Sequence, residues 1–111
     1  MPARFIIDRT KNGQYYFILE SSIQENLLTS EPFIFHISCM HAINSVRTSC
    51  ENDYNYQDGM ATNGEYFFVL RDQDHQILGT SLFYATRSWM QNAIARIKKE
   101  TATAIIEDHS K

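Results

Sequence analysis

The stretch Asn12–Leu19, with the sequence NGQYYFIL, returns 51 positions later as Asn63–Leu70, NGEYFFVL. The match continues without a gap through two further pairs of segments: Thr29-Ser30 with Thr80-Ser81, and Ala42-Ile43 with Ala93-Ile94. An internal repeat of this length indicates one supersecondary unit used twice, because each copy needs its neighbour to bury its hydrophobic face. The repeat therefore predicts an architecture, although it predicts no chemistry.

The length and composition predict one globular domain. The chain has 111 residues, and its apolar and charged fractions, 43% and 21%, lie near the average of folded proteins. One copy alone would be marginal in stability, whereas the whole chain reaches the usual size of a domain. We expect a single domain over residues 1–111, with repeats at about 3–50 and 54–101 and a terminal strand at about 102–109.

The net charge and the lack of targeting signals bear on which partners the protein binds and where in the cell it is located. The formal net charge is −3 and no run of Lys or Arg is present, which disfavours a general attraction to nucleic acid or anionic lipid. The chain starts Met1-Pro2 without the basic and apolar regions of a secretory signal, and no apolar stretch reaches the roughly 20 residues of a membrane helix. Two cysteines make no disulfide framework. We expect a cytoplasmic protein.

Local patterns predict the same elements in each copy. Strands are expected at about 5–8, 14–20 and 26–30, and Asn12-Gly13 is typical of a tight hairpin turn. A helix is expected at about 36–47, where Cys39, Ile43 and Val46 recur at helical spacing. The β-branched tail at 102–108 is expected to form a last strand on a sheet edge.

The predicted fold class is therefore α+β. It consists of two tandem ββ(β)α repeats with pseudo-two-fold symmetry, an antiparallel sheet covered by two helices, and an extra C-terminal strand. Thr86 is a good N-cap for the second helix. Phe35 stands at the matching position of the first copy and cannot cap, so the first helix could begin at a different residue.

These motifs resemble a known family. The Asn-Gly turn, the aromatic strand, the Thr-Ser pair and the Ala-Ile helix, each present twice, are similar to the YegP-like proteins, small tandem-repeat bacterial proteins of unknown function. The resemblance covers essentially the whole chain and implies an α+β fold with no established catalytic residues. The chain departs from the family pattern at Ala42, Ala93 and Arg96, where Gly, Gly and Ser are usual.

The polar residues retained in both copies are the first candidate site: Thr29, Ser30, Thr80 and Ser81. Hydroxyls at strand ends commonly bond to nearby backbone groups, and the alternative is a groove that contacts a ligand. A serine nucleophile needs a base held against it, and no histidine occupies matching positions in the two copies. Neither catalytic residues nor a cofactor are therefore expected.

A metal site at His36, Cys39 and His41 is disfavoured because the second copy has no matching ligands.

An excess of apolar residues is the second candidate site. Its members would lie on the strand face away from the helices or beside the helix starts: Tyr16, Ile18, Phe67, Val69, Phe35 and Trp89. An antiparallel sheet covered on one side usually has polar residues on the other. Either the two halves interlock over this second face, or a partner covers it.

These patterns favour a non-enzymatic protein-interaction or binding module, whose partner is unknown or is a second copy in a homodimer. The alternative is a small-molecule binding protein with a pocket between the two repeats, lined by Tyr15, Tyr66 and the Thr-Ser pairs. Nucleic-acid binding through basic residues of the second helix is a weaker hypothesis, because cations near a helix C-terminus also offset the helix dipole.

Overall fold

A computed structural model describes all of residues 1–111, and it places seven strands in one sheet. Strands and helices follow in chain order: β1 (Arg4–Arg9), β2 (Tyr15–Glu20), β3 (Asn26–Thr29), α1 (His36–Ser49), β4 (Tyr56–Met60), β5 (Tyr66–Arg71), β6 (Ile77–Thr80), α2 (Arg87–Glu100) and β7 (Ile105–Asp108). Short 3-10 turns, η1 (Asp53–Asn55) and η2 (Thr101–Thr103), precede β4 and β7. The α+β class and the terminal strand are confirmed.

The order of strands across the sheet is β4-β5-β6-β3-β2-β1-β7. All neighbours run antiparallel except β1 and β7, which are parallel, with Arg4 beside Ile105 and Ile7 beside Asp108. The sheet is therefore mixed, whereas the sequence led us to expect an antiparallel one. β7 runs antiparallel to β6, the strand that precedes it in the chain, and it lies beside β1 only after the chain has passed through α2. No hairpin turn joins β7 to β1, so no turn imposes an antiparallel direction on this pair.

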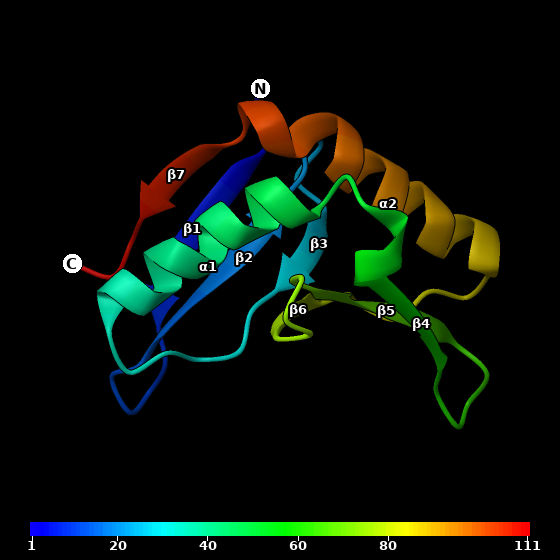
Figure 1. Cartoon of the computed structure of the whole chain (residues 1–111), viewed down its shortest axis with the longest axis horizontal. Coiled ribbons are helices and arrows are strands. Elements are labelled where there is room, and N and C mark those ends of the chain that lie inside the picture. The colour runs from blue at the N-terminus through cyan, green and yellow to red at the C-terminus, as the bar shows by residue number, and fades with distance from the viewer.

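Both helices lie on the same side of the twisted sheet, α1 over the first half and α2 over the second (Figure 1). One hydrophobic core lies between the sheet and the two helices. It contains Phe17 and Leu19 of β2, Phe68 and Leu70 of β5, and the buried stripe of each helix. Two T-shaped aromatic pairs, Phe5 with Phe17 and Tyr56 with Phe68, are part of this packing. Neither helix has the length and hydropathy to cross a bilayer.

The helix starts and hairpin turns follow their local sequence. Thr86 caps α2 as expected, because its side chain accepts the Trp89 N–H. Phe35 provides no side-chain cap, yet α1 begins at the matching repeat position. The start at His36 agrees with the helix expected at about 36–47, and the different start that the missing cap allowed does not occur. Gly13 and Gly64 both take the positive φ that the turns require, +83° and +86°.

The two halves meet where β3 pairs with β6. Thr29 lies opposite Thr80, and these residues are equivalent in the repeat. A two-fold axis between the halves would bring such equivalent residues face to face, so the pairing is compatible with the duplicated sequence.

One departure from the repeat has a packing reason at this junction. Gly79 corresponds to Leu28, and a Cβ at position 79 would lie 2.5 Å from the Leu28 Cγ. Two leucines cannot occupy this space, so one member of the pair is glycine.

Candidate functional site

The predicted surface residues of the strands lie on the sheet face that no helix covers, called the outer face here. Residues that pair directly across strands point to the same side of a sheet. The pairs join six residues into one row across the outer face: Ile6, Ile18, Thr29, Thr80, Val69 and Gln57. All but Gln57 are half-buried. The centre of the outer face is thus apolar with two hydroxyls.

Aromatic residues continue this surface. Tyr16 of β2 and Phe67 of β5 hold equivalent, half-buried positions. The Phe67 ring lies over Gly59, where an added Cβ would come within 2.4 Å of it, and forms a T-shaped pair with Phe83. The Phe83 side chain is itself exposed. An aromatic pair therefore stands on the second half of the outer face.

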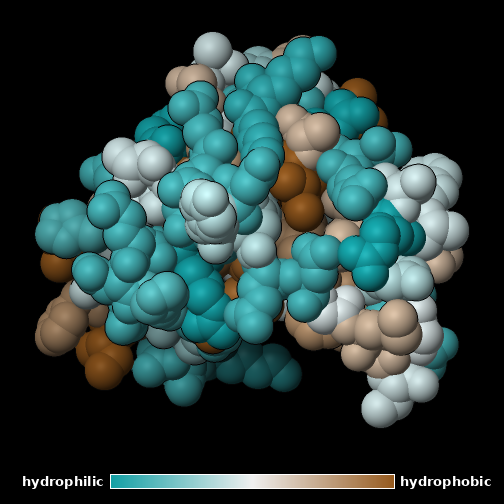
Figure 2. Space-filling model, turned by 45° about the vertical axis from the view of Figure 1, so that its right-hand side comes forward, coloured by the Kyte–Doolittle hydropathy of each residue, from teal (hydrophilic) through white to brown (hydrophobic).

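The remaining predicted surface residues lie beside the helix starts. Phe35 precedes α1 and is 65% exposed, and Trp89 in the first turn of α2 is 67% exposed. Ile34 and Ile37 are also exposed, whereas their counterparts in the second half are the small residues Ala85 and Ser88. Hydrophobic atoms gather at the lower left of Figure 2, at the end of the molecule where α1 begins.

The repeated hydroxyls have a structural use in both halves. Ser30 Oγ accepts the Phe17 N–H at 2.9 Å, and Ser81 Oγ accepts the Phe68 N–H at 2.9 Å. Each serine also donates to the carbonyl of the following residue. Both serines are buried, and neither these serines nor Thr29 and Thr80 line any cavity.

Cys39 and His36, two of the residues considered for metal binding, have different structural roles. Cys39 is buried in the core, and that burial raises the pKa of its thiol to about 11. His36 contacts Asp108 of β7, with 2.8 Å between Nε2 and Oδ2. Hydrogen bonds from Ser110, assisted by His36, lower the pKa of Asp108 to about 2. His36 thereby ties the start of α1 to the last strand.

The largest cavity is a cleft of about 690 Å³ between β4 and α2, called the β4–α2 cleft here. It lies within the second half, whereas the sequence suggested a pocket between the halves. Its lining residues are Asp53, Tyr56, Gln57, Asp58, Gln91, Ile94, Ala95 and Lys98. Figure 2 shows hydrophobic atoms sunk among hydrophilic ones on this side of the molecule.

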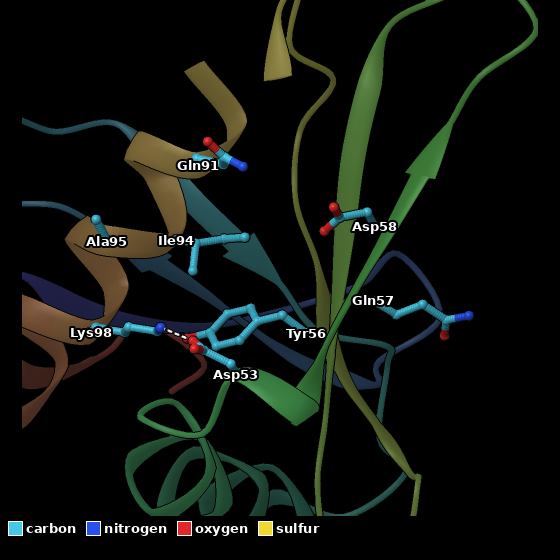
Figure 3. Close-up of a pocket in the computed structure, with 8 residues that line it drawn as sticks. All are labelled: Asp53, Tyr56, Gln57, Asp58, Gln91, Ile94, Ala95 and Lys98. Carbon is cyan, nitrogen blue, oxygen red and sulfur yellow. Dashed lines mark hydrogen bonds and ion pairs between the residues drawn. The ribbon is translucent and has the colours of Figure 1, made fainter. Parts of the chain in front are cut away.

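The β4–α2 cleft has an apolar floor with charges at its rim. Ile94 projects from α2 toward Tyr56 of β4, while Gln57 points away from the helix (Figure 3). Lys98 pairs with Asp53, and its Nζ lies 5.6 Å from the centre of the Tyr56 ring. Arg87 pairs with Asp58 at 3.0 Å. The phenol of Tyr56 donates to the Cys50 carbonyl, and its burial raises its pKa, so this hydroxyl is a structural donor.

Sequence reasoning missed this cleft. The residues that form it carry no motif of their own. A signal was nevertheless present in the sequence repeat, because the repeat matches β1 with β4 and leaves β7 without a counterpart in the second half.

Comparison with known proteins places the chain in a family. UPF0339 protein YegP of Escherichia coli strain K12 is 30% identical over 110 residues, which cover 99% of this chain and 100% of that protein. The chain belongs to the UPF0339 (YegP) family. A UPF0339 protein of Acinetobacter baylyi is 33% identical over 108 residues, 97% of each chain. Residues 61–108 match a domain described as of unknown function, DUF1508.

Two solved structures share the UPF0339 fold. The solution NMR structure of YegP from E. coli has a TM-score of 0.93 at 30% identity and covers 99% of this chain and 95% of that chain. The solution NMR structure of a UPF0339 protein from Shewanella oneidensis has a TM-score of 0.92 at 29% identity, covering 99% and 93%. The resemblance inferred from the motifs is confirmed, and the family is one of unknown function.

Proposed function

We propose that this protein is a non-enzymatic interaction module whose outer face binds protein, with a second copy of the chain as the first candidate partner. The observation that carries the proposal is the apolar row through Ile18 and Val69 on a face without helices. An antiparallel sheet exposed to water normally carries polar residues on its free face. Half-buried Ile, Val, Tyr and Phe on such a face favour a partner that removes them from water.

The duplicated architecture supports a symmetric partner. We infer that the chain is a tandem duplication in which residues 3–50 and 54–101 are related by an approximate dyad through the Thr29–Thr80 pair. The outer face then presents nearly the same surface twice, at Tyr16–Ile18 and at Phe67–Val69. Closed two-fold association buries one such patch against another and is the commonest form of homo-oligomer.

Hydroxyl chemistry gives no support to a catalytic role. Ser30 and Ser81 are engaged with backbone groups on both sides. The thiols of Cys39 and Cys50 are buried and unpaired, which fits the reducing cytoplasm that we propose as the location.

Sedimentation velocity over a wide concentration range tests the proposal. We expect a concentration-dependent shift from monomer to dimer, which Ile18→Lys and Val69→Lys should abolish. Asn44→Lys is the matched control, because it adds the same charge at an exposed position on α1, away from the outer face. A monomer at every concentration, or a dimer that survives both outer-face substitutions and Phe67→Lys, would contradict self-association through this face.

A further inference from the structure

The first half shows how its sheet edge is completed. Strand β7 lies parallel beside β1, and backbone bonds run from Ile105 N–H to the Ala3 carbonyl and from His109 N–H to the Ile7 carbonyl. Helix α1 holds the incoming segment from above. The Arg47 guanidinium donates to the carbonyls of Thr101 and Ala104, at 2.8 Å each. This edge is thus closed by a strand and by a cation that binds main-chain oxygens.

The second half has the same parts without the strand. β4 is equivalent to β1 and forms the opposite edge of the sheet, with β5 as its single neighbour. Lys98 corresponds to Arg47, and Tyr56 corresponds to Phe5. The cation lies over the ring in both cases, since the Arg47 Cζ is 5.1 Å from the Phe5 ring centre. The β4–α2 cleft of about 690 Å³ is lined by the counterparts of residues that contact η2 and β7 in the first half: Tyr56, Gln57 and Asp58 match Phe5, Ile6 and Ile7, and Lys98 matches Arg47.

The exposure of equivalent residues follows the missing strand. Ile43 of α1 is fully buried, whereas Ile94 of α2 is half-buried and lines the cleft. Phe5 is likewise fully buried, and Tyr56 is only partly so. An exposed strand edge with unpaired backbone groups accepts an added strand readily, which is the basis of peptide recognition by β-augmentation.

We propose that the β4–α2 cleft binds an extended peptide segment of another protein, which adds to the sheet as a strand parallel to β4. Lys98 turns from Asp53 to the peptide carbonyls, as Arg47 serves the carbonyls before β7. One apolar side chain of the peptide rests on Tyr56 and Ile94. The site lies on the helix side of the sheet and shares only Gln57 with the outer-face row, so it does not depend on the function proposed above.

Charge defines the peptide further. In the first half His36 of α1 binds Asp108, a residue of the added strand. In the second half Arg87 stands in place of His36, and its carboxylate partner is Asp58 of β4 itself. Arg87 therefore needs no acid from the ligand, and an acidic residue there would face Asp58. We expect a peptide without carboxylates, with alternating apolar residues and a small residue at the Lys98 end.

A second copy of the chain fits this edge less well. Two β4 strands paired antiparallel about a two-fold axis would bring their central Asp58 residues together. Like charges placed directly opposite on neighbouring strands are destabilising. Such a pairing also leaves Lys98 without the carbonyls that the parallel arrangement supplies.

A titration with a synthetic peptide tests the proposal. The probe has the sequence of residues 101–109 with Glu107→Gln, Asp108→Asn and an amidated C-terminus, so it carries no carboxylate. Binding is followed by amide chemical shifts of the full-length protein. We expect saturable shifts in β4 and in α2 from Arg87 to Lys98. Lys98→Met should weaken binding about tenfold, as expected for a lost charge-assisted hydrogen bond. Lys99→Met, one residue further and exposed, should leave affinity unchanged.

Further arms separate the competing explanations. The same peptide methylated at its central backbone nitrogens keeps its side chains and should not bind, because it cannot pair with the edge. The Ile18→Lys variant should bind the peptide normally, which separates this site from the outer face. The proposal is overturned by an absence of saturable shifts, by equal binding of the methylated peptide, by an unchanged affinity in Lys98→Met, or by β4 shifts that follow protein concentration without peptide.

Discussion

Ser30 and Ser81, which accept backbone N–H groups of β2 and β5, allow the sharpest test of the packing. Ser30→Ala removes the oxygen that accepts the Phe17 N–H at 2.9 Å. Phe17 is fully buried, so water cannot replace the lost acceptor. An unsatisfied buried donor costs about 1–3 kcal/mol. The second bond of Ser30 goes to the carbonyl of Glu31, which is exposed and can be solvated, so it adds little.

The expected loss is therefore about 2 kcal/mol of unfolding free energy, or about 10 °C in Tm for a domain of this size. The same arithmetic applies to Ser81→Ala, because Ser81 accepts the Phe68 N–H at 2.9 Å and is equally buried. We expect the two variants to agree within about 0.5 kcal/mol. Urea unfolding followed by circular dichroism measures both.

Ser88→Ala is the control, since Ser88 is exposed on α2 and should change stability by less than about 0.5 kcal/mol. Ser30→Thr, which keeps the acceptor, should retain more stability than Ser30→Ala. The reasoning is refuted if either alanine variant is as stable as the control. It is also refuted if the losses of unfolding free energy in Ser30→Ala and Ser81→Ala differ by more than about 1 kcal/mol, because the two serines would then not be equivalent.

Three further outcomes follow from the structure. Leu28→Gly and Gly79→Leu should each destabilise by about 3 kcal/mol, and the double variant should recover at least half of the combined loss in urea unfolding, since it places the leucine on the other side of the junction; simple additivity would contradict this. Because the folded-state pKa of Asp108 is lowered to about 2, its contribution is complete above about pH 4 and is lost as the pH falls toward 2. Asp108→Asn should flatten stability over that range, and an unchanged slope would count against the hydrogen bonds that Asp108 receives from Ser110 and His36. Cys39, with a thiol pKa of about 11, should hold about a hundredfold less thiolate than a free thiol at neutral pH and react with a disulfide reagent only after unfolding; rapid reaction of the native protein would refute its burial.

Much of the fold could be predicted because it is written in local patterns. Asn-Gly turns, period-two strands and helical stripes are short-range signals, and each appears twice. Thr86 identified the start of α2 through its capping chemistry. The start of α1 at His36 could not be read in this way, since Phe35 offers no cap and the tertiary packing of Cys39, Ile43 and Val46 decides it.

The direction of β7 and the β4–α2 cleft were beyond local reasoning. Parallel pairing has no turn signature, so nothing near Ile105–Asp108 indicates which way the strand runs. The cleft arises from a missing neighbour rather than from a motif. Its residues can be identified only by aligning the second half with the first, in which Arg47 is the counterpart of Lys98 and Ile7 is the counterpart of Asp58.

Hydrogen exchange of the free protein tests the central claim most directly, namely that two equivalent halves differ in having one closed edge and one open edge. In β1 we expect slow amide exchange from Arg4 to Ile7, because β2 and β7 pair with these residues on both sides. In β4 we expect alternation, with slow exchange only where an amide bonds to β5. Equal protection of β1 and β4 along their lengths would show that the β4 edge is already occupied, and would contradict the account.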